Sequence, residues 1–149
     1  MSRPEHSSQI EAVRALARAS RFLERASGEL SLAHYRVLAA IASGDERASR
    51  VARRLAIGKP TISASVEALS QRGLLERSHV AGDQRATSLR LTEAGTALLD
   101  RVEDEMTARI GRLCAHTPDG DRLLEALTWL GAAIDQVQAE RAADRQVSP

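Results

Sequence analysis

The sequence contains few aromatic residues, a single cysteine and no long apolar run. Only one Phe, one Tyr and one Trp occur among 149 residues, so the core has to be built from Leu, Val, Ile and Ala, which pack well between helices. The single cysteine, Cys114, permits no internal disulfide and is typical of a reducing compartment. The longest apolar run, residues 37–42, is too short to cross a membrane, and the N-terminus lacks the apolar segment of a signal peptide. These absences predict a mainly helical, cytoplasmic protein with no membrane partner.

Motifs for catalysis and for metal or cofactor binding are also missing from the sequence. It contains no nucleophile–base–acid set, no phosphate-binding glycine loop and no pair of catalytic carboxylates, so we expect neither an enzyme nor a cofactor. Cys114 and His116 lie two residues apart on a predicted helix and do not face the same way, and no second pair completes a metal site. We interpret Cys114 as a small apolar residue rather than a redox switch.

Charge is distributed unevenly along the chain, although the formal net charge is only +1. Residues 1–46 are neutral overall, and residues 93–149 carry six basic against eleven acidic residues. The central block, residues 47–91, carries nine basic residues against three acidic ones. A segregated basic block is typical of a nucleic-acid-binding surface, although a solvated helix face also carries several such charges.

The apolar pattern predicts one domain, residues 1–149, with six helices and one hairpin. Ser31, Thr92 and Thr117 are expected to cap the second, fifth and sixth helices at their N-termini. After Gly73 the apolar period changes from helical to alternating, which predicts a two-stranded hairpin, or wing. The helices are expected at about 8–25, 32–42, 47–55, 60–72, 93–115 and 118–141.

The third and fourth predicted helices and the hairpin follow the order of a winged helix-turn-helix, and they coincide with the basic block. In this motif the second helix enters the major groove of DNA while the first crosses the backbone. Ile62, Val66 and Leu69 define the buried face of the fourth predicted helix. The opposite face is expected to present Pro60, Thr61, Ala64, Glu67, Ala68 and Gln71.

In the order and spacing of five segments, the chain resembles the MarR family of bacterial transcription regulators. The segments are ELSLAHYRVL (29–38), VARRLAIGKPTIS (51–63), ALSQRGLLER (68–77), GDQRAT (82–87) and LRLTEAG (89–95). The resemblance implies a dimer joined through terminal helices, at about 8–28 and 92–141, which flank a winged helix-turn-helix region at about 30–91. The expected fold class is therefore mainly α with a small β-hairpin wing and flanking dimerisation helices.

The resemblance further implies that a wing arginine enters the minor groove, held by an aspartate two residues earlier, and Asp83 and Arg85 stand at those positions. Ala64 and Ala68 stand where relatives often have basic residues, so we expect weaker hydrogen bonding to base edges. For Ser63, which lies nearer the side of the helix, both DNA contact and simple solvation stay open. The predicted DNA-binding residues are Arg50, Arg53, Arg54, Lys59, Pro60, Thr61, Ser63, Ala64, Arg77, Asp83 and Arg85.

Two functional interpretations follow from the sequence. The first is a homodimeric repressor that binds a pseudo-palindromic site in double-stranded DNA. The resemblance adds a small aromatic or phenolic effector, for which Phe22, His34, Tyr35 and Arg36 are candidate lining residues; ordinary packing is the alternative for these four. The second interpretation is a winged-helix protein-interaction module without specific DNA binding, for which Ala64 and Ala68 are the best evidence.

Overall fold

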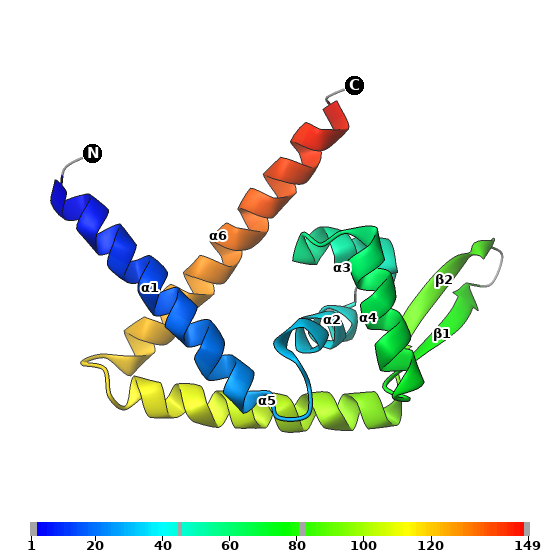
Figure 1. Ribbon diagram of the computed structural model, residues 1–149, viewed down its shortest axis with the longest axis horizontal. Coiled ribbons are helices and arrows are strands. Elements are labelled where there is room, and N and C mark those ends of the chain that lie inside the picture. The colour runs from blue at the N-terminus through cyan, green and yellow to red at the C-terminus, as the bar shows by residue number, and fades with distance from the viewer. Residues whose placement is uncertain (1–2, 45, 81–82, 148–149) are drawn as a thin grey trace.

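The computed structural model describes residues 3–44, 46–80 and 83–147, of which residues 3–5, 79–80, 83–87 and 145–147 are described by their backbone alone. Within these residues it contains six helices and one hairpin, so the predicted fold class is confirmed (Figure 1). No helix in the described ranges is long and apolar enough to span a membrane. The elements are α1 (Arg3–Ala26), α2 (Leu32–Ala42), α3 (Ala48–Leu55), α4 (Lys59–Gln71), β1 (Leu75–Val80), β2 (Asp83–Leu91), α5 (Glu93–Cys114) and α6 (Gly120–Val147).

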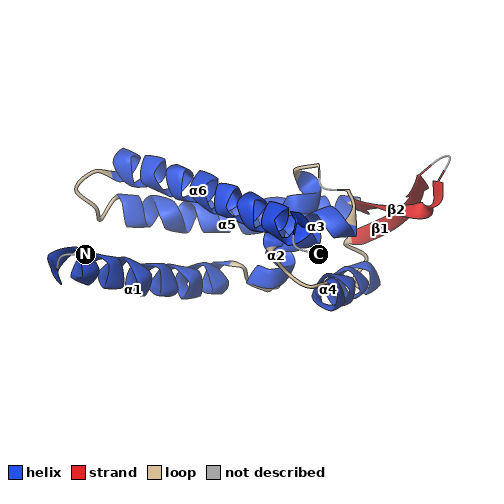
Figure 2. Cartoon of the chain, turned by 90° about the horizontal axis from the view of Figure 1, so that it is seen from above, coloured by secondary structure: helices blue, strands red, loops and turns tan. Residues whose placement is uncertain are grey.

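The helices form a compact unit at one end of the molecule and an open, extended part at the other. Helix α5 runs along one edge of the molecule, and α1 and α6 both pack on it and then project away from it (Figure 1). Helices α2, α3 and α4 gather with the hairpin around the first half of α5, and the wing lies at the end of the molecule opposite to α1 (Figure 2). Helix α1 and the wing thus lie at opposite ends of the molecule, whereas the C-terminal half of α6 returns to contact α3.

The apolar core lies inside the compact unit, where helices α2 to α4 meet. Leu30, Leu38, Val51, Ile62 and Leu69 are almost completely buried there. The predicted inner face of α4 is therefore confirmed. The part of α5 up to Met106 closes the core with four further buried side chains, those of Leu98, Leu99, Val102 and Met106.

Two of the three predicted helix caps are present, and the third is wrong. The Ser31 hydroxyl accepts a hydrogen bond from the backbone N–H of His34 at 3.2 Å, and the Thr92 hydroxyl accepts one from Gly95 at 3.0 Å. Thr117 instead donates its hydroxyl to a carbonyl oxygen at the end of α5, at 2.8 Å.

Helix α6 accordingly begins later than the sequence predicted. The Asp119 carboxylate accepts a hydrogen bond from the backbone N–H of Arg122 at 3.0 Å, so Asp119 takes the capping role that Thr117 was expected to fill. Helix α1 begins earlier than expected, at Arg3, because Pro4 falls in its first turn, where a missing N–H costs nothing.

Gly95 allows the start of α5 to pack against the chain that leads into β1. A Cβ atom at Gly95 would collide with the backbone carbonyl of Leu74. We therefore expect Gly95→Ala to lower the free energy of unfolding by about 1–3 kcal/mol, the range for overpacked sites. Gly111→Ala is the control in the same helix, because a Cβ there meets nothing within 4 Å. Urea unfolding measures both, and equal effects of the two variants would contradict this explanation.

Candidate nucleic-acid interface

The first turn of α4 is exposed and positively polarised. Ala56 adopts a left-handed conformation, with φ of 53°, and this makes the tight turn between α3 and α4. Helix α4 then starts after Gly58 with no side-chain cap, and because Pro60 has no N–H, the N–H groups without a partner within the helix in this turn are those of Lys59 and Thr61. Lys59 is exposed at the same end. Free N–H groups and a lysine together favour a phosphate at this position.

The predicted outward face of α4 is largely present in the structure. Thr61, Ala64 and Glu67 are exposed, whereas Ala68 is half-buried. Three predicted DNA contacts, Pro60, Thr61 and Ala64, therefore share one exposed surface with Lys59.

Arg77 lies beside this surface and is already paired. Its guanidinium lies 3.3 Å from a carboxylate oxygen of Glu67, and the other carboxylate oxygen accepts a hydrogen bond from the Gln71 amide at 3.1 Å. Ser63 lies on the side of α4 that faces Arg77, since both line a small cleft of about 150 Å³. The Glu67–Arg77 pair joins α4 to β1, and the spacing of the two residues in the sequence gave no sign of it.

The three arginines of α3 face α6, a neighbour that the sequence did not indicate. Arg50, Arg53 and Arg54 are exposed and lie on one side of the helix. That side is turned toward the C-terminal half of α6, where Asp135 and Gln138 line the same cleft. The pattern of α3 alone identified the charged face but could not show which distant segment lies opposite.

The base of the wing is firmly attached to the loop after α2. The strands pair in antiparallel register, with Arg77 opposite Leu89 and an irregularity between His79 and Val80. The backbone N–H of Leu89 donates to the Glu46 carbonyl at 2.6 Å, and the hydroxyl of Ser88 donates to the Glu46 carboxylate at 3.2 Å.

At the tip of the wing, the side chains of Asp83 and Arg85 lie outside the described part of the chain, and only their backbone, within β2, is described. Their predicted roles in the minor groove therefore stay predictions.

Among the predicted effector residues, Phe22 and Tyr35 contact different parts of α5. The Arg109 guanidinium lies over the ring of Phe22, 5.9 Å from its centroid. The Tyr35 hydroxyl donates a hydrogen bond to Glu103 at 3.4 Å. Burial raises the pKa of Tyr35 above its ordinary value, and the charge and hydrogen bond of Glu103 raise it further, so the phenol stays protonated at neutral pH.

The other two candidates are His34 and Arg36, on either side of Tyr35 in α2. Burial lowers the pKa of His34, and the nearby charge of Arg72 lowers it further, which favours the neutral imidazole. Arg36 is exposed. Phe22 and Tyr35 thus contact different residues of α5, and His34 lies near Arg72.

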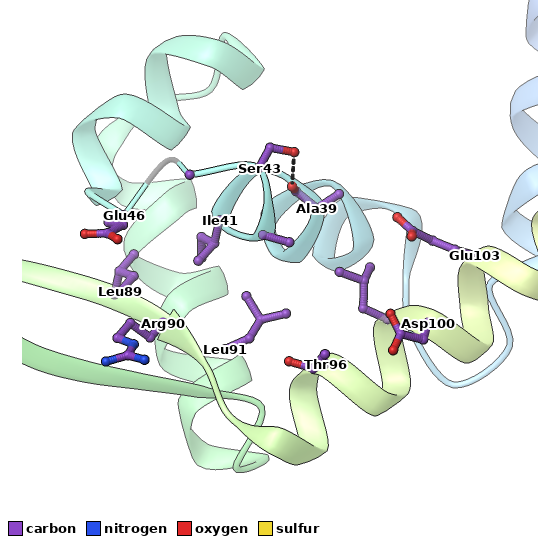
Figure 3. A pocket seen from close by; sticks show the side chains of 13 residues that line it. Ala39, Ile41, Ser43, Glu46, Leu89, Arg90, Leu91, Thr96, Asp100 and Glu103 are labelled. Atoms are coloured by element: carbon purple, nitrogen blue, oxygen red, sulfur yellow. Dashed lines mark hydrogen bonds between the residues drawn. The ribbon is translucent and has the colours of Figure 1, made fainter.

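A cleft of about 560 Å³ lies between the end of α2, strand β2 and the start of α5 (Figure 3). Its rim carries the carboxylates of Glu46, Asp100 and Glu103 and the guanidinium of Arg90. With three carboxylates against one guanidinium, the rim favours cationic or neutral polar groups over anionic ones. The sequence did not predict this cleft, because it forms only where three separate segments meet.

Comparisons with known proteins agree with the geometry. The model of the MarR family matches residues 29–86, the segment that spans α2 to the wing. PecS, an HTH-type transcriptional regulator of Dickeya dadantii (strain 3937), is 35% identical over 57 residues, which are 38% of this chain and 34% of PecS. The match thus spans only about a third of the length of PecS.

Solved structures are similar over nearly the whole chain. The transcriptional repressor CouR, bound to a 23-mer DNA duplex, has a TM-score of 0.75 and 26% identity, covering 90% of this chain and 97% of that one. CouR from Rhodococcus jostii RHA1, bound to p-coumaroyl-CoA, has a TM-score of 0.68 and 23% identity, covering 83% and 87% of the two chains. The similarity therefore includes the terminal helices that the family model does not cover.

Proposed function

We propose, because the chain belongs to the MarR family, that this transcriptional regulator binds a pseudo-palindromic operator as a homodimer in the cytoplasm and represses transcription. One observation carries the proposal: the exposed first turn of α4, with Lys59 and uncapped N–H groups, belongs to a winged helix-turn-helix unit rich in arginine. In such a unit the second helix enters the major groove.

The proposed contacts with DNA are of two kinds: contacts to phosphate, which position the protein, and contacts to base edges, which read the sequence. Lys59 and the first N–H groups of α4 are assigned to phosphate, which fixes the helix in the groove. Thr61 can hydrogen bond to a base edge, and Ala64 can contact a thymine methyl group. Ser63 and Arg77 flank this surface, and Asp83 and Arg85 are assigned to the minor groove. Arg50, Arg53 and Arg54 stay candidate phosphate contacts because they are exposed.

Exposed apolar side chains on the terminal helices support the proposed dimer. Such a row of apolar side chains, left uncovered in one chain, is typical of an interface. A second copy related by a two-fold axis would cover both rows and place two α4 helices on half-sites about 10 bp apart. The exposed residues are Ile10, Val13 and Leu16 on α1, and Leu124, Leu127, Trp129, Leu130, Ile134 and Val137 on α6.

Regulation by a small effector is part of the proposal. CouR has been solved both with DNA and with p-coumaroyl-CoA, which supports a ligand that changes DNA binding in a protein of this fold. An aromatic effector near Phe22, His34, Tyr35 and Arg36 would be enclosed between the compact unit and the terminal helices of the dimer.

An electrophoretic shift with the DNA upstream of its own gene tests the function. We expect this duplex to bind more tightly than a scrambled duplex of equal length. The logarithm of the affinity should fall steeply with the logarithm of the salt concentration, by about 0.9 for each phosphate contact. Equal binding of both duplexes, or binding indifferent to salt, would favour the protein-interaction module instead.

Glu67→Gln is expected to tighten DNA binding about two- to fivefold, because it removes a carboxylate from the exposed face of α4 and frees Arg77 for phosphate. The change should be largest at low salt, since exposed charges are screened. Glu125→Gln is the control, because it removes an exposed carboxylate from the start of α6, which lies at the end of the molecule away from the compact unit (Figure 1). An equal gain in the control would mean that only net charge matters.

A further inference from the structure

The cleft between the end of α2, strand β2 and the start of α5 has a charge pattern that the proposed function does not use. We call it the α2–β2–α5 cleft. None of the residues assigned above to DNA, to the effector or to the dimer interface lines it. Neither DNA nor a second copy would therefore fill it in the proposed dimer, and its volume of about 560 Å³ falls within the range of small-molecule sites.

Negative charge lies at both ends of the α2–β2–α5 cleft. Figure 3 shows Glu46, from the loop after α2, at one end and the carboxylates of Asp100 and Glu103, from α5, at the other. Asp100 and Glu103 are three residues apart in a helix and therefore lie on the same face. The charges thus come from two separate segments on opposite sides of the cleft rather than from one acidic run.

Direct ion pairs do not neutralise these carboxylates. The Ser88 hydroxyl donates to Glu46 at 3.2 Å and the Tyr35 hydroxyl donates to Glu103 at 3.4 Å, but both donors are neutral and leave the carboxylates charged. In the part of the chain whose side chains the structure describes, no basic group forms an ion pair with any of the three. Arg90 is the one basic residue in the described lining, so three carboxylates against one guanidinium leave a net charge of −2.

Between its two charged ends the cleft is apolar. Ile41 and Leu91 lie between Glu46 and Asp100 (Figure 3). Methylene groups that cover such a surface are removed from water, which favours binding. A hydrated metal ion gains nothing from an apolar surface, and Mg²⁺ requires oxygen ligands in octahedral positions around it rather than at two ends of a cleft. The pattern therefore favours an organic cation over a metal ion.

We propose that the α2–β2–α5 cleft binds a linear organic dication, a molecule that carries one ammonium group at each end of a methylene chain. One ammonium group would bind the Glu46 carboxylate, and the other would lie between the carboxylates of Asp100 and Glu103. Hydrogen bonds from an ammonium to a carboxylate are among the strong ones, because both groups are charged. The methylene chain would cover Ile41 and Leu91, and the two positive charges match the net charge of the lining.

Binding of the dication would also stabilise the compact unit, because it would join two separate segments. Glu46 holds the base of the wing through Ser88 and Leu89, so a dication bound to Glu46 and to α5 would connect the wing to α5. A ligand that binds only the folded chain raises the melting temperature as its concentration rises. Binding therefore has two readouts, heat and melting temperature, and neither requires DNA.

Isothermal calorimetry of the full-length protein at constant ionic strength tests the proposal. The probes are three diamines of increasing length, putrescine, cadaverine and hexamethylenediamine, and we expect saturable binding of one diamine per chain. Pentylamine has a methylene chain with a single ammonium group, and it should bind about tenfold or more weakly than the tightest diamine, the effect of one lost charged hydrogen bond. Mg²⁺ carries two charges without a chain and should also bind more weakly.

Variants at the two ends test whether both carboxylate positions are used. Asp100→Asn and Glu46→Gln should each weaken diamine binding about tenfold and reduce the rise in melting temperature. The glutamine side chain keeps an oxygen that can accept the hydrogen bond from Ser88, so the base of the wing is preserved. Asp104→Asn is the matched control, because Asp104 is an exposed carboxylate one turn further along α5 and does not line the cleft.

Arg90→Gln gives the opposite sign. Removing the guanidinium from the lining should tighten diamine binding, whereas a residue that only supports the wall of the cleft would weaken binding when replaced. Arg112→Gln on α5 is the control for a lost positive charge, because Arg112 is exposed and does not line the cleft. Circular dichroism melting without diamine shows that each variant is folded.

Four results would overturn the proposal: no saturable binding of any diamine, equally tight binding of pentylamine or Mg²⁺, the same loss in Asp104→Asn as in Asp100→Asn, or weaker binding in Arg90→Gln. The first would show that the cleft holds no such cation, and the second that two ammonium groups on one chain are not required. Failure of every diamine would leave the proposed function unaffected, and failure to bind any DNA would leave the calorimetric result unaffected.

Discussion

Leu127→Asp combined with Leu130→Asp is expected to convert the protein from a dimer into a folded monomer and to abolish operator binding. Both side chains are exposed, at 41% and 36%, on a helix that projects beyond the compact unit (Figure 1). In the proposed dimer each copy would bring two carboxylates into an apolar seam, where an unpaired charge costs several kcal/mol. Neither residue belongs to the core of the single chain, so the fold itself should survive.

The loss of DNA binding follows from the loss of the second half-site. A monomer engages one half-site only, so its affinity for the operator should fall about a thousandfold or more, toward the level of non-specific binding. Sedimentation at micromolar concentration measures the dimer, and an electrophoretic shift measures the DNA complex.

Thr128→Asp with Ala132→Asp is the matched control, because it places the same charges on the opposite side of α6. This variant should stay a dimer. A wild-type protein that sediments as a monomer, or a Leu127/Leu130 variant that still dimerises, would contradict the proposed interface.

The buried faces of helices and most of their N-terminal caps were predictable, because each depends on residues close together in the sequence. The spacing of Ile62, Val66 and Leu69 fixed the buried face of α4, and the hydroxyls of Ser31 and Thr92 marked helix starts. Even so, a local signal can be ambiguous. Thr117 precedes a proline as an N-cap does, yet its hydroxyl closes the helix before it, and the decisive Asp119 lies two residues further on.

Contacts between distant segments were not predictable in the same way. The charged face of α3 could be recognised from Arg50, Arg53 and Arg54, but the sequence does not specify which helix lies opposite. The same holds for Tyr35, whose partner Glu103 is 68 residues away. A helical pattern identifies the face that a residue occupies, and only the packed chain determines what that face meets.

The wing provides the most direct test of specificity. Arg85→Ala is expected to lower operator affinity by at least about 1–3 kcal/mol, the scale of a lost specific arginine contact. A narrow minor groove concentrates negative potential, and arginine enters it readily because its guanidinium is permanently charged and weakly hydrated. Arg85→Lys should recover only part of the loss, since an ammonium is a compact, strongly hydrated charge. The affinity of the folded dimer for its operator is the measured quantity.

Asp83→Ala tests whether the aspartate orients Arg85 or only shapes the turn. A carboxylate two residues earlier can hold the guanidinium in a two-point pair and so reduce the ordering cost on binding. We therefore expect Asp83→Ala to weaken DNA binding, although it removes a negative charge and Coulomb's law alone predicts the reverse. Glu76→Ala is the control for charge: it removes an exposed carboxylate from the base of the same hairpin and should leave binding unchanged or slightly tighter. Because the base of the wing is held by Glu46 through Ser88 and Leu89, neither change should unfold the hairpin. If Asp83→Ala and Glu76→Ala both tighten binding, Asp83 acts only as a local negative charge and the proposed role of the Asp83–Arg85 pair is wrong.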